Sequence, residues 1–394
     1  MEKILVTGGS HAEIPLIEAL HEMGYFVITT GNNAEGLGHR AADLYVRGDF
    51  SDRQFVLSLA EEQGVSGIVS GCNDFAYLSA AYACEKLGLP GHDGIAAAEI
   101  IHHKDRFRGL LAECGLPAPA NRLIRSDDEL REVCDEIGYP LLIKPVDLTG
   151  GKGVRICSSF GEACAAYRDA VSATREDHVL AEQMICGENH GVSAIIRDKR
   201  TVFAFFDNEE YYLNKYLVSG AYAPADVSED IRRDVARQID IIAEKLCLGD
   251  GLFHCQCIMD KKGRAYLIDP CRRAPGDLYV RLVEYSTGVK YSRIIVRAEL
   301  GLDIGELPEK GDTAEKCIAR ECVMTDRNGV FKGISFDAEL EKYLYKKLIW
   351  AVPGEPVEDF LKYKAGIVFF DFPDRDTMKN ALDGLYDKMK IIIG

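Results

Sequence analysis

Two lysines and three glycines that could hold phosphate lie in one short stretch, LLIKPVDLTGGKGV at residues 141–154. Lys144 ends an apolar run typical of a β-strand, and Lys152 lies in the following turn. The surrounding glycines are Gly150, Gly151 and Gly153. Backbone N–H groups of a glycine-rich loop can close over phosphate oxygens, and ammonium groups add positive charge. The stretch predicts a phosphate-binding hairpin or an ordinary glycine hairpin. A P-loop is excluded because neither Ser nor Thr follows Lys152.

A second candidate site lies on two later strands, expected at about residues 250–260 and 264–271. Each places a polar side chain among apolar ones, Gln256 on the first and Asp269 on the second. Strand alternation puts His254 and Gln256 on the same face. A carboxylate beside an amide oxygen is a plausible Mg²⁺ site, of the kind used with nucleotide phosphates.

Three further segments carry polar groups that could bind a ligand or simply face water. Lys104 lies in the helical run HHKDR, and an expected strand ends at Glu182-Gln183-Met184, where exposed backbone suits an adenine edge. For the lysine and the acid, a solvated surface position is the alternative. The segment at residues 211–216, rich in tyrosine and containing Lys215, predicts a substrate loop or a packed hairpin.

The elements that must position these groups begin with a repeated strand–helix pattern over residues 1–95. Helices are expected at 14–23, 51–63 and 75–87, each between apolar strands, which predicts a doubly wound parallel sheet. The sequence argues against a nicotinamide site in this fold, because the first turn reads Gly-Gly-Ser-His-Ala and the second strand ends without a ribose-binding acid.

The later elements have a mixed order. Helices are expected at 95–114, 128–137, 160–173, 230–246 and 376–388, and a turn is expected at Gly187-Glu188. Beyond residue 301 the strands KCIARECVM, KLIWAV and GIVFFDF carry no catalytic motif, and they predict a small α+β cap.

Composition limits the partners. The chain has 394 residues and a net charge of −16, which argues against nucleic acid and membrane surfaces and leaves small molecules as partners. No apolar run approaches the ~20 residues of a membrane span, so a cytoplasmic location is expected. Thirteen cysteines without a Cys-x-x-Cys pair predict reduced thiols.

The order of these parts resembles the ATP-grasp superfamily, in particular the carboxylate–amine ligases that look like carbamoyl-phosphate synthetase large-subunit halves. The resemblance covers about residues 1–300. It implies an α/β chain with an N-terminal doubly wound parallel-sheet (pre-ATP-grasp) domain at 1–95 and a two-lobed α+β ATP-grasp domain at 96–300. The lid lobe would span about 118–184, and a C-terminal α+β subdomain would span 301–394.

The resemblance also implies roles for residues at matching positions. The implied ATP-binding residues are Lys104, Lys144, Gly150, Gly151, Lys152, Gly153, Glu182, Gln183, Met184 and Glu188. Gln256 and Asp269 would bind Mg²⁺, and Arg273 and Lys144 would be catalytic. Lys215, Arg272 and Arg281 are expected to hold substrate carboxylates.

Two positions depart from the family pattern. Glu188 stands one residue before the usual ribose-binding acid, and Asn189 has the expected spacing, so either could make that contact. Cys271 occupies the position where a second metal ligand, usually Asn, is expected. A neutral thiol is a poor ligand for Mg²⁺, and a nucleophilic thiol activated by the neighbouring arginines is the competing hypothesis.

The implied function is an ATP-dependent carboxylate–amine ligase that forms an amide through an acyl phosphate and releases ADP and phosphate. The alternatives are a nucleotide-binding regulator without turnover and a phosphotransferase acting on a small carboxylate. The expected partners are a small carboxylate and an amine, and a homodimer is conceivable. The sequence does not identify either substrate.

Overall fold

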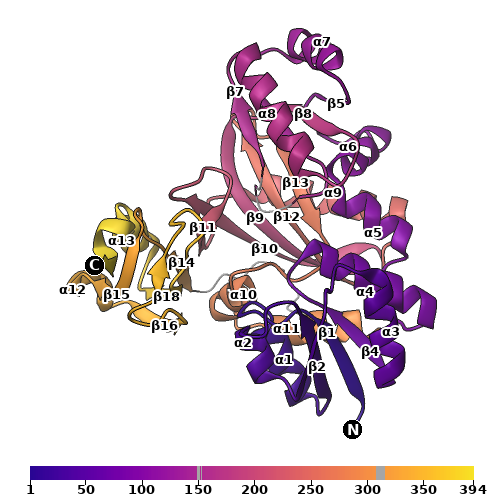
Figure 1. Cartoon of the computed structure of the whole chain (residues 1–394), viewed down its shortest axis with the longest axis vertical. Coiled ribbons are helices and arrows are strands. Elements are labelled where there is room, and N and C mark those ends of the chain that lie inside the picture. Colours follow the sequence, from indigo (N-terminus) through magenta and orange to yellow (C-terminus); the bar gives the residue numbers. More distant parts are fainter. Residues whose placement is uncertain (149–150, 152, 308–315) are drawn as a thin grey trace.

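The structure is a computed structural model that describes residues 1–148, 151, 153–307 and 316–394 of the chain. Figure 1 shows three parts: the N-terminal strands and helices at the bottom, a small lobe around α7 and α8 at the top, and the last strands at the left. A long sheet that contains β9, β10 and β12 connects them.

The N-terminal part is a four-stranded parallel sheet in the order β3-β2-β1-β4, so the predicted parallel α/β arrangement is confirmed. Asp52 accepts hydrogen bonds from the N–H groups of Gln54 and Phe55, which fixes the start of the second predicted helix. The elements are β1 (Lys3–Thr7), α1 (Ile14–Glu22), β2 (Phe26–Gly31), α2 (Leu37–Ala41), β3 (Leu44–Arg47), α3 (Arg53–Gln63), β4 (Gly67–Ser70) and α4 (Asp74–Leu87).

The single helix expected over residues 95–114 is wrong. The chain forms α5 (Ile95–His102) and α6 (Lys104–Glu113), with His103 in an extended conformation between them. The amide of Lys104 donates to the carbonyl of Val146, 3.1 Å away, so a tertiary contact breaks the helix without any Gly or Pro. The break makes Lys104 the first residue of α6.

The small lobe at the top of Figure 1, hereafter the lid lobe, is an antiparallel sheet in the order β5-β8-β6-β7 covered by two helices. Its apolar core, which includes Ile143 and Ala181, is separate from the other cores of the described chain. Its elements are β5 (Asn121–Ile124), α7 (Asp127–Ile137), β6 (Leu141–Pro145), β7 (Arg155–Cys157), α8 (Phe160–Ala173) and β8 (Val179–Gln183).

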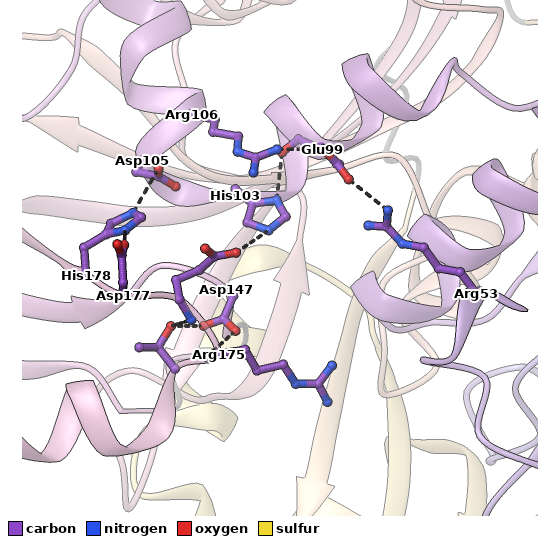
Figure 2. Close-up of polar contacts among 11 residues, drawn as sticks. Arg53, Glu99, His103, Asp105, Arg106, Asp147, Arg175, Asp177 and His178 are labelled. Atoms are coloured by element: carbon purple, nitrogen blue, oxygen red, sulfur yellow. Dashed lines mark hydrogen bonds and ion pairs between the residues drawn. The ribbon is translucent and has the colours of Figure 1, made fainter.

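Polar contacts join the lid lobe to α6. Figure 2 shows His178, just before β8, pointing at Asp105 of α6, with 3.3 Å between the imidazole and carboxylate. In the same view the Asp147 carboxylate accepts the backbone N–H of Arg175 at 3.0 Å, which ties the end of α8 to the segment after β6. The contact between His178 and Asp105 holds α6, which begins at Lys104, beside the lid lobe.

The long sheet has eight strands in the order β13-β12-β9-β10-β11-β14-β18-β16. The turn expected at Gly187-Glu188 is wrong, because both residues pair with β12 as the start of β9. Helix α9 covers one part of the sheet. Helices α10 and α11 pack between the sheet and α1. The elements before residue 300 are β9 (Gly187–Arg197), β10 (Arg200–Tyr211), β11 (Val218–Ala223), α9 (Glu229–Leu246), β12 (Gly251–Asp260), β13 (Ala265–Cys271), α10 (Tyr279–Thr287) and α11 (Tyr291–Glu299).

Some of the C-terminal strands extend the long sheet, and the others form a separate small sheet. β14 (Cys317–Val323), β16 (Leu344–Ile349) and β18 (Gly366–Phe372) extend the long sheet, because β14 pairs with β11. A second, three-stranded sheet lies beside them, built from β15 (Gly329–Phe336), β17 (Pro356–Val357) and β19 (Met389–Ile393).

The last predicted helix is divided into α13 (Arg375–Leu382) and α14 (Leu385–Lys388), with Gly384 at positive φ between them, and α12 (Ala338–Glu341) is short. The predicted domain limits at residues 95 and 300 stay predictions. Among the described residues, no helix is both long and apolar enough to cross a membrane.

Candidate functional site

Two cavities meet at the face of the long sheet below the lid lobe. The first, hereafter the lid cavity, has a volume of about 420 Å³ and lies between the lid lobe and β12–β13. Apolar side chains from both sides line it, including Leu142, Ile156, Met184 and Ile258. Its shape and lining suit a flat heteroaromatic ring that needs few polar contacts.

Lys144 lies at the wall of the lid cavity. Its ammonium lies 2.5 Å from the carboxylate of Glu182, which also accepts from Arg108 at 2.6 Å. Burial alone would raise the pKa of Glu182, but the charges of Arg108 and Lys144 outweigh it and lower that pKa to about 2. Glu182 is therefore a permanent anion that fixes the position of Lys144.

Glu182 does not form the ligand-facing hinge that the sequence predicts. Its side chain is fully buried, and Gln183 donates its N–H to the carbonyl of Ala120 at 2.8 Å. The segment that lines the lid cavity starts at Met184 and continues through Ile185 and Cys186. The predicted hinge is thus displaced by two residues toward β9.

The ribose position is also shifted relative to the first expectation. Glu188 directs its side chain to solvent, with 79% of it exposed, and it does not line the lid cavity. Asn189 does line it. Of the two residues that the sequence left open, the structure places Asn189 in the cavity.

The glycine turn is described only in part. Gly150 and Lys152 lie outside the described residues. Gly151 lines the lid cavity at φ +70°, and a Cβ there would lie 2.1 Å from the carbonyl oxygen of Tyr216. Gly153 has φ +73°, and its Cβ would meet Pro145. Both positions need glycine for the backbone conformation and the close approach.

Lys215 and Tyr216 line the lid cavity from the loop between β10 and β11. The tyrosine hydroxyl accepts the N–H of Ile156 at 3.0 Å, so the loop contacts the returning strand of the lid lobe. The loop therefore borders a cavity, as the substrate-loop alternative for residues 211–216 requires.

The second cavity, hereafter the base cavity, has a volume of about 360 Å³. It is lined by the segment at the start of α4, the end of α5, the start of α6, the strands β10 to β14 and the segment that leads into α10. Gln256, Asp269 and Tyr216 line both cavities, so the two meet at these residues.

Gln256 and Asp269 lie where the cavities meet, together with Lys104. The ammonium of Lys104 lies 3.4 Å from Asp269 and donates to the carbonyl of Leu148 at 2.6 Å. Oδ1 of Asp269 is buried and has no hydrogen-bond partner in the described part of the chain. This is the oxygen nearest the Lys104 ammonium, which pairs with it without a hydrogen bond, so its lone pairs remain open to a hard cation and the donor set fits Mg²⁺.

Within the described ranges, however, no group of three His, Cys, Asp or Glu side chains could enclose a metal ion. The amide nitrogen of Gln256 faces the Glu209 carboxylate at 3.1 Å. An ion at Asp269 would accordingly need oxygen atoms from water or a ligand to complete its shell.

Arg273 lines the base cavity and donates to the carboxylate of Asp74 at 2.7 Å. His254 lies nearby, and burial, followed by the charge of Arg273, lowers its pKa to about 3. Burial raises the pKa of Cys271 to about 11, despite the opposing charge of Arg273. The Cys271 thiol is neutral near pH 7, which argues against the nucleophile hypothesis.

Arg272 and Arg281 are not in the site, contrary to the sequence-based expectation. Arg272 is buried and donates to Asp93 at 2.7 Å, in the segment before α5. Arg281 lies on α10 and pairs with Glu18 and Glu284. Both arginines connect parts of the fold. Their places in the sequence do not show whether the side chains face a cavity or pair with other residues of the chain.

Asp207, Glu209 and Arg320 are among the charged residues of the base cavity that were missed from sequence. Asp207 and Glu209 lie near the end of β10, and Arg320 lies in β14. The signals were a run of acids directly after an apolar strand, FFDNEE, and an Arg-Glu pair inside the strand CIARECV. Charges inside an apolar strand are rarely buried without a reason.

Comparison with known proteins agrees with this architecture. Residues 103–269 match the family model of the carbamoyl-phosphate synthase L chain, ATP binding domain. The carbamoyl phosphate synthase large chain of Xanthomonas campestris pv. campestris is 27% identical over 287 residues, which cover 68% of this chain and 26% of that protein. The chain thus spans about a quarter of the length of the curated relatives it matches.

Two solved structures share the whole fold. An L-amino acid ligase from Bacillus licheniformis superimposes with a TM-score of 0.83 and 18% identity over 100% of this chain and 99% of that one. A phosphoribosylglycinamide synthetase from Anaerococcus prevotii gives a TM-score of 0.78 and 19% identity over 100% of both chains.

The antiparallel lid lobe, the long sheet and the cavities between them make up the ATP-grasp fold. Within this fold, residues 103–269 are similar to the ATP-binding domain of the carbamoyl-phosphate synthase L chain.

Proposed function

We propose that this chain is an ATP-dependent carboxylate–amine ligase that forms an amide and releases ADP and phosphate. The observation that carries the proposal is the meeting of the two cavities at Asp269 and Gln256. ATP would lie in the lid cavity, with adenine against Met184 and Ile185 and with the phosphates directed toward Lys144 and Asp269. The two other substrates would enter the base cavity.

The reaction follows in two balanced steps. A carboxylate oxygen attacks the γ-phosphorus, the bond to the ADP oxygen breaks, and an acyl phosphate forms. The amine nitrogen then attacks the acyl carbon, the bond to phosphate breaks, and the nitrogen loses a proton. Lys104 and Lys144 would stabilise negative charge on the phosphates, and Arg273 would stabilise it on the acyl group. No protein nucleophile is required.

Mg²⁺ would be held by Asp269, with the Gln256 amide oxygen available after rotation of that side chain. When bound, the ion would neutralise phosphate charge. Asp269 itself also orients Lys104, because the two groups lie 3.4 Å apart.

The partners we propose are a small carboxylate and an amine, while a homodimer stays a prediction. A regulator without turnover and a phosphotransferase remain the competing functions. They differ in product: the regulator would release no ADP, and the phosphotransferase would stop at a phosphorylated acid.

Lys144→Met provides the test. The wild-type protein should release ADP with a carboxylate and hydroxylamine and should yield a hydroxamate, which reports the acyl phosphate. Loss of one preorganised charge should lower kcat/KM by about two to three orders of magnitude. Lys199→Met is a matched control, because Lys199 bonds to the carbonyl of Leu248 away from both cavities.

The hydroxamate is measured by mass spectrometry and ADP by a coupled assay. ADP without any hydroxamate or amide would exclude the ligase. Near-normal turnover of a folded Lys144→Met protein would mean that the phosphate site is elsewhere.

A further inference from the structure

Two carboxylates of the base cavity lack a cationic partner. Asp207 is fully buried, and within the described residues its carboxylate accepts hydrogen bonds from the Tyr279 hydroxyl and the N–H of Gly191. Glu209, two residues along β10, accepts from the Tyr211 hydroxyl and the Gln256 amide. Within the described residues, neither carboxylate has a Lys, Arg or His within ion-pair distance.

The other acids that line this cavity are already paired with cations. Asp74 pairs with Arg273, Asp269 with Lys104, and Asp277 with Lys364. The contrast separates Asp207 and Glu209 from the rest of the wall. A buried carboxylate is costly unless a charged partner compensates it, and a ligand ammonium group would supply that partner.

Arg320 gives the same cavity a cationic pole. It lines the cavity, is only 2% exposed, and its Nε has no hydrogen-bond partner in the described chain. One of its terminal nitrogens donates to the carbonyl oxygen of Asp277 at 3.2 Å. A guanidinium with an unused donor can accept a carboxylate.

We propose that the amine substrate is an α-amino acid, bound with its ammonium group against Asp207 and Glu209 and its carboxylate toward Arg320. Glu209 touches Gln256, at the meeting of the two cavities, so the amine nitrogen would lie next to the acyl phosphate. Arg320 would hold the unreactive carboxylate away from it. This inference rests on the proposed ligase function and specifies its second substrate.

A phosphorylated amine fits less well. A third cavity at the ends of β1 and β2 adjoins the base cavity through Asn73 and Asp277. Its glycine turn is where an anion would bind in a parallel α/β sheet. The carboxylate of Glu13 already accepts the Ser10 N–H at 2.7 Å and the Cys72 N–H at 2.8 Å. The chain's own acid thus occupies these donors.

The test has two stages with the full chain. Hydroxamate formation with hydroxylamine first identifies an acid that the protein activates, independently of any amine. That acid is then offered with alanine, alaninamide, ethylamine and O-phosphoethanolamine, and ADP and amide products are measured. A free α-amino acid, such as alanine, should be preferred over its amide and over its decarboxylated amine. The expected preference is about tenfold or more in kcat/KM.

Two kinds of variant separate the poles. Glu209→Gln and Asp207→Asn should raise KM for the amino acid about ten- to a hundredfold while KM for ATP changes little. Arg320→Met should bring the ratio of kcat/KM for the amino acid to kcat/KM for its amide toward one. If the methionine variant does not fold, Arg320→Lys is measured in its place and should keep part of the preference. Glu210→Gln is the matched control, since Glu210 does not line this cavity.

Hydroxamate formation combined with equal use of amino acids and their amides, or with preference for the phosphorylated amine, would overturn the inference and leave the ligase standing. An unchanged amino acid KM in Glu209→Gln and Asp207→Asn would overturn it as well. Absence of hydroxamate with every acid would instead remove the proposed function, and the inference with it.

Discussion

The lid cavity and the base cavity are built by different means. The lid cavity has a mainly apolar wall, and one of its two lysines, Lys144, is held by Glu182, which also accepts from Arg108. The base cavity is lined by five carboxylates, Asp74, Asp207, Glu209, Asp269 and Asp277. Its wall comes from the N-terminal part, helices α5, α6 and α10, and five strands of the long sheet.

The difference teaches where specificity can reside. An apolar slot with a fixed cation suits one recurring ligand, whereas a wall assembled from distant segments can change residue by residue. We therefore expect differences in substrate specificity to arise from the residues of the base cavity. Substitutions should separate the two cavities in their effects on nucleotide and substrate.

The largest effect is expected for Asp269→Asn, because Asp269 lines both cavities. Loss of its charge would remove the partner of Lys104 and the hard oxygen donor, and kcat/KM should fall about a thousandfold. Calorimetric titration should still detect nucleotide binding through the lid cavity. Loss of binding together with turnover in a folded protein would contradict the separation of the two cavities.

Arg272→Met should act on stability rather than on substrate affinity. It leaves Asp93 buried without its cation, which typically costs about 3–5 kcal/mol. Arg281→Met is the control, because its partner Glu18 is 54% exposed and such pairs contribute about 0–1 kcal/mol. Urea unfolding measures both. A stable Arg272→Met protein with a raised substrate KM would restore the substrate-binding role predicted from sequence.

The smallest effect concerns the opposite side of β10, where Glu210 lies near Glu321 outside the base cavity. Burial raises the pKa of Glu210 from 4.5 to about 7. Between these pH values the folded state keeps a proton that the unfolded state has lost, so this group lowers stability as pH rises. Glu210→Gln should raise Tm by about a few degrees at pH 8 and change it less at pH 5. An equal change at both pH values would exclude this cause.

Local patterns predicted much of the lid cavity. Lys144, Gly151 and Gly153 stand in one stretch, and Gln256 and Asp269 stand on neighbouring strands, so alternation and strand pairing were enough to bring them together. Met184 was predicted, but the continuation of the cavity wall through Ile185 and Cys186 was missed, because the end of β8 depends on its pairing with β5.

The base cavity depended on contacts that no local pattern contains. Arg272 and Asp93 are 179 residues apart in sequence, so the choice between a ligand and an internal partner was not visible. The break at His103 likewise follows from the Lys104 contact with Val146. Helical periodicity on both sides of the break was correct, but a tertiary hydrogen bond decided its place.

The pairing of β14 with β11 bears on how the chain could be shortened or recombined with relatives. A version ending at residue 300 would leave the edge of β11 without its neighbour, from Gly220 to Ala223. Unpaired N–H and C=O groups on an exposed strand attract other chains. Such a shortened protein should self-associate. The residues after 300 therefore protect the edge of the long sheet from other chains, and they also form part of the base cavity wall.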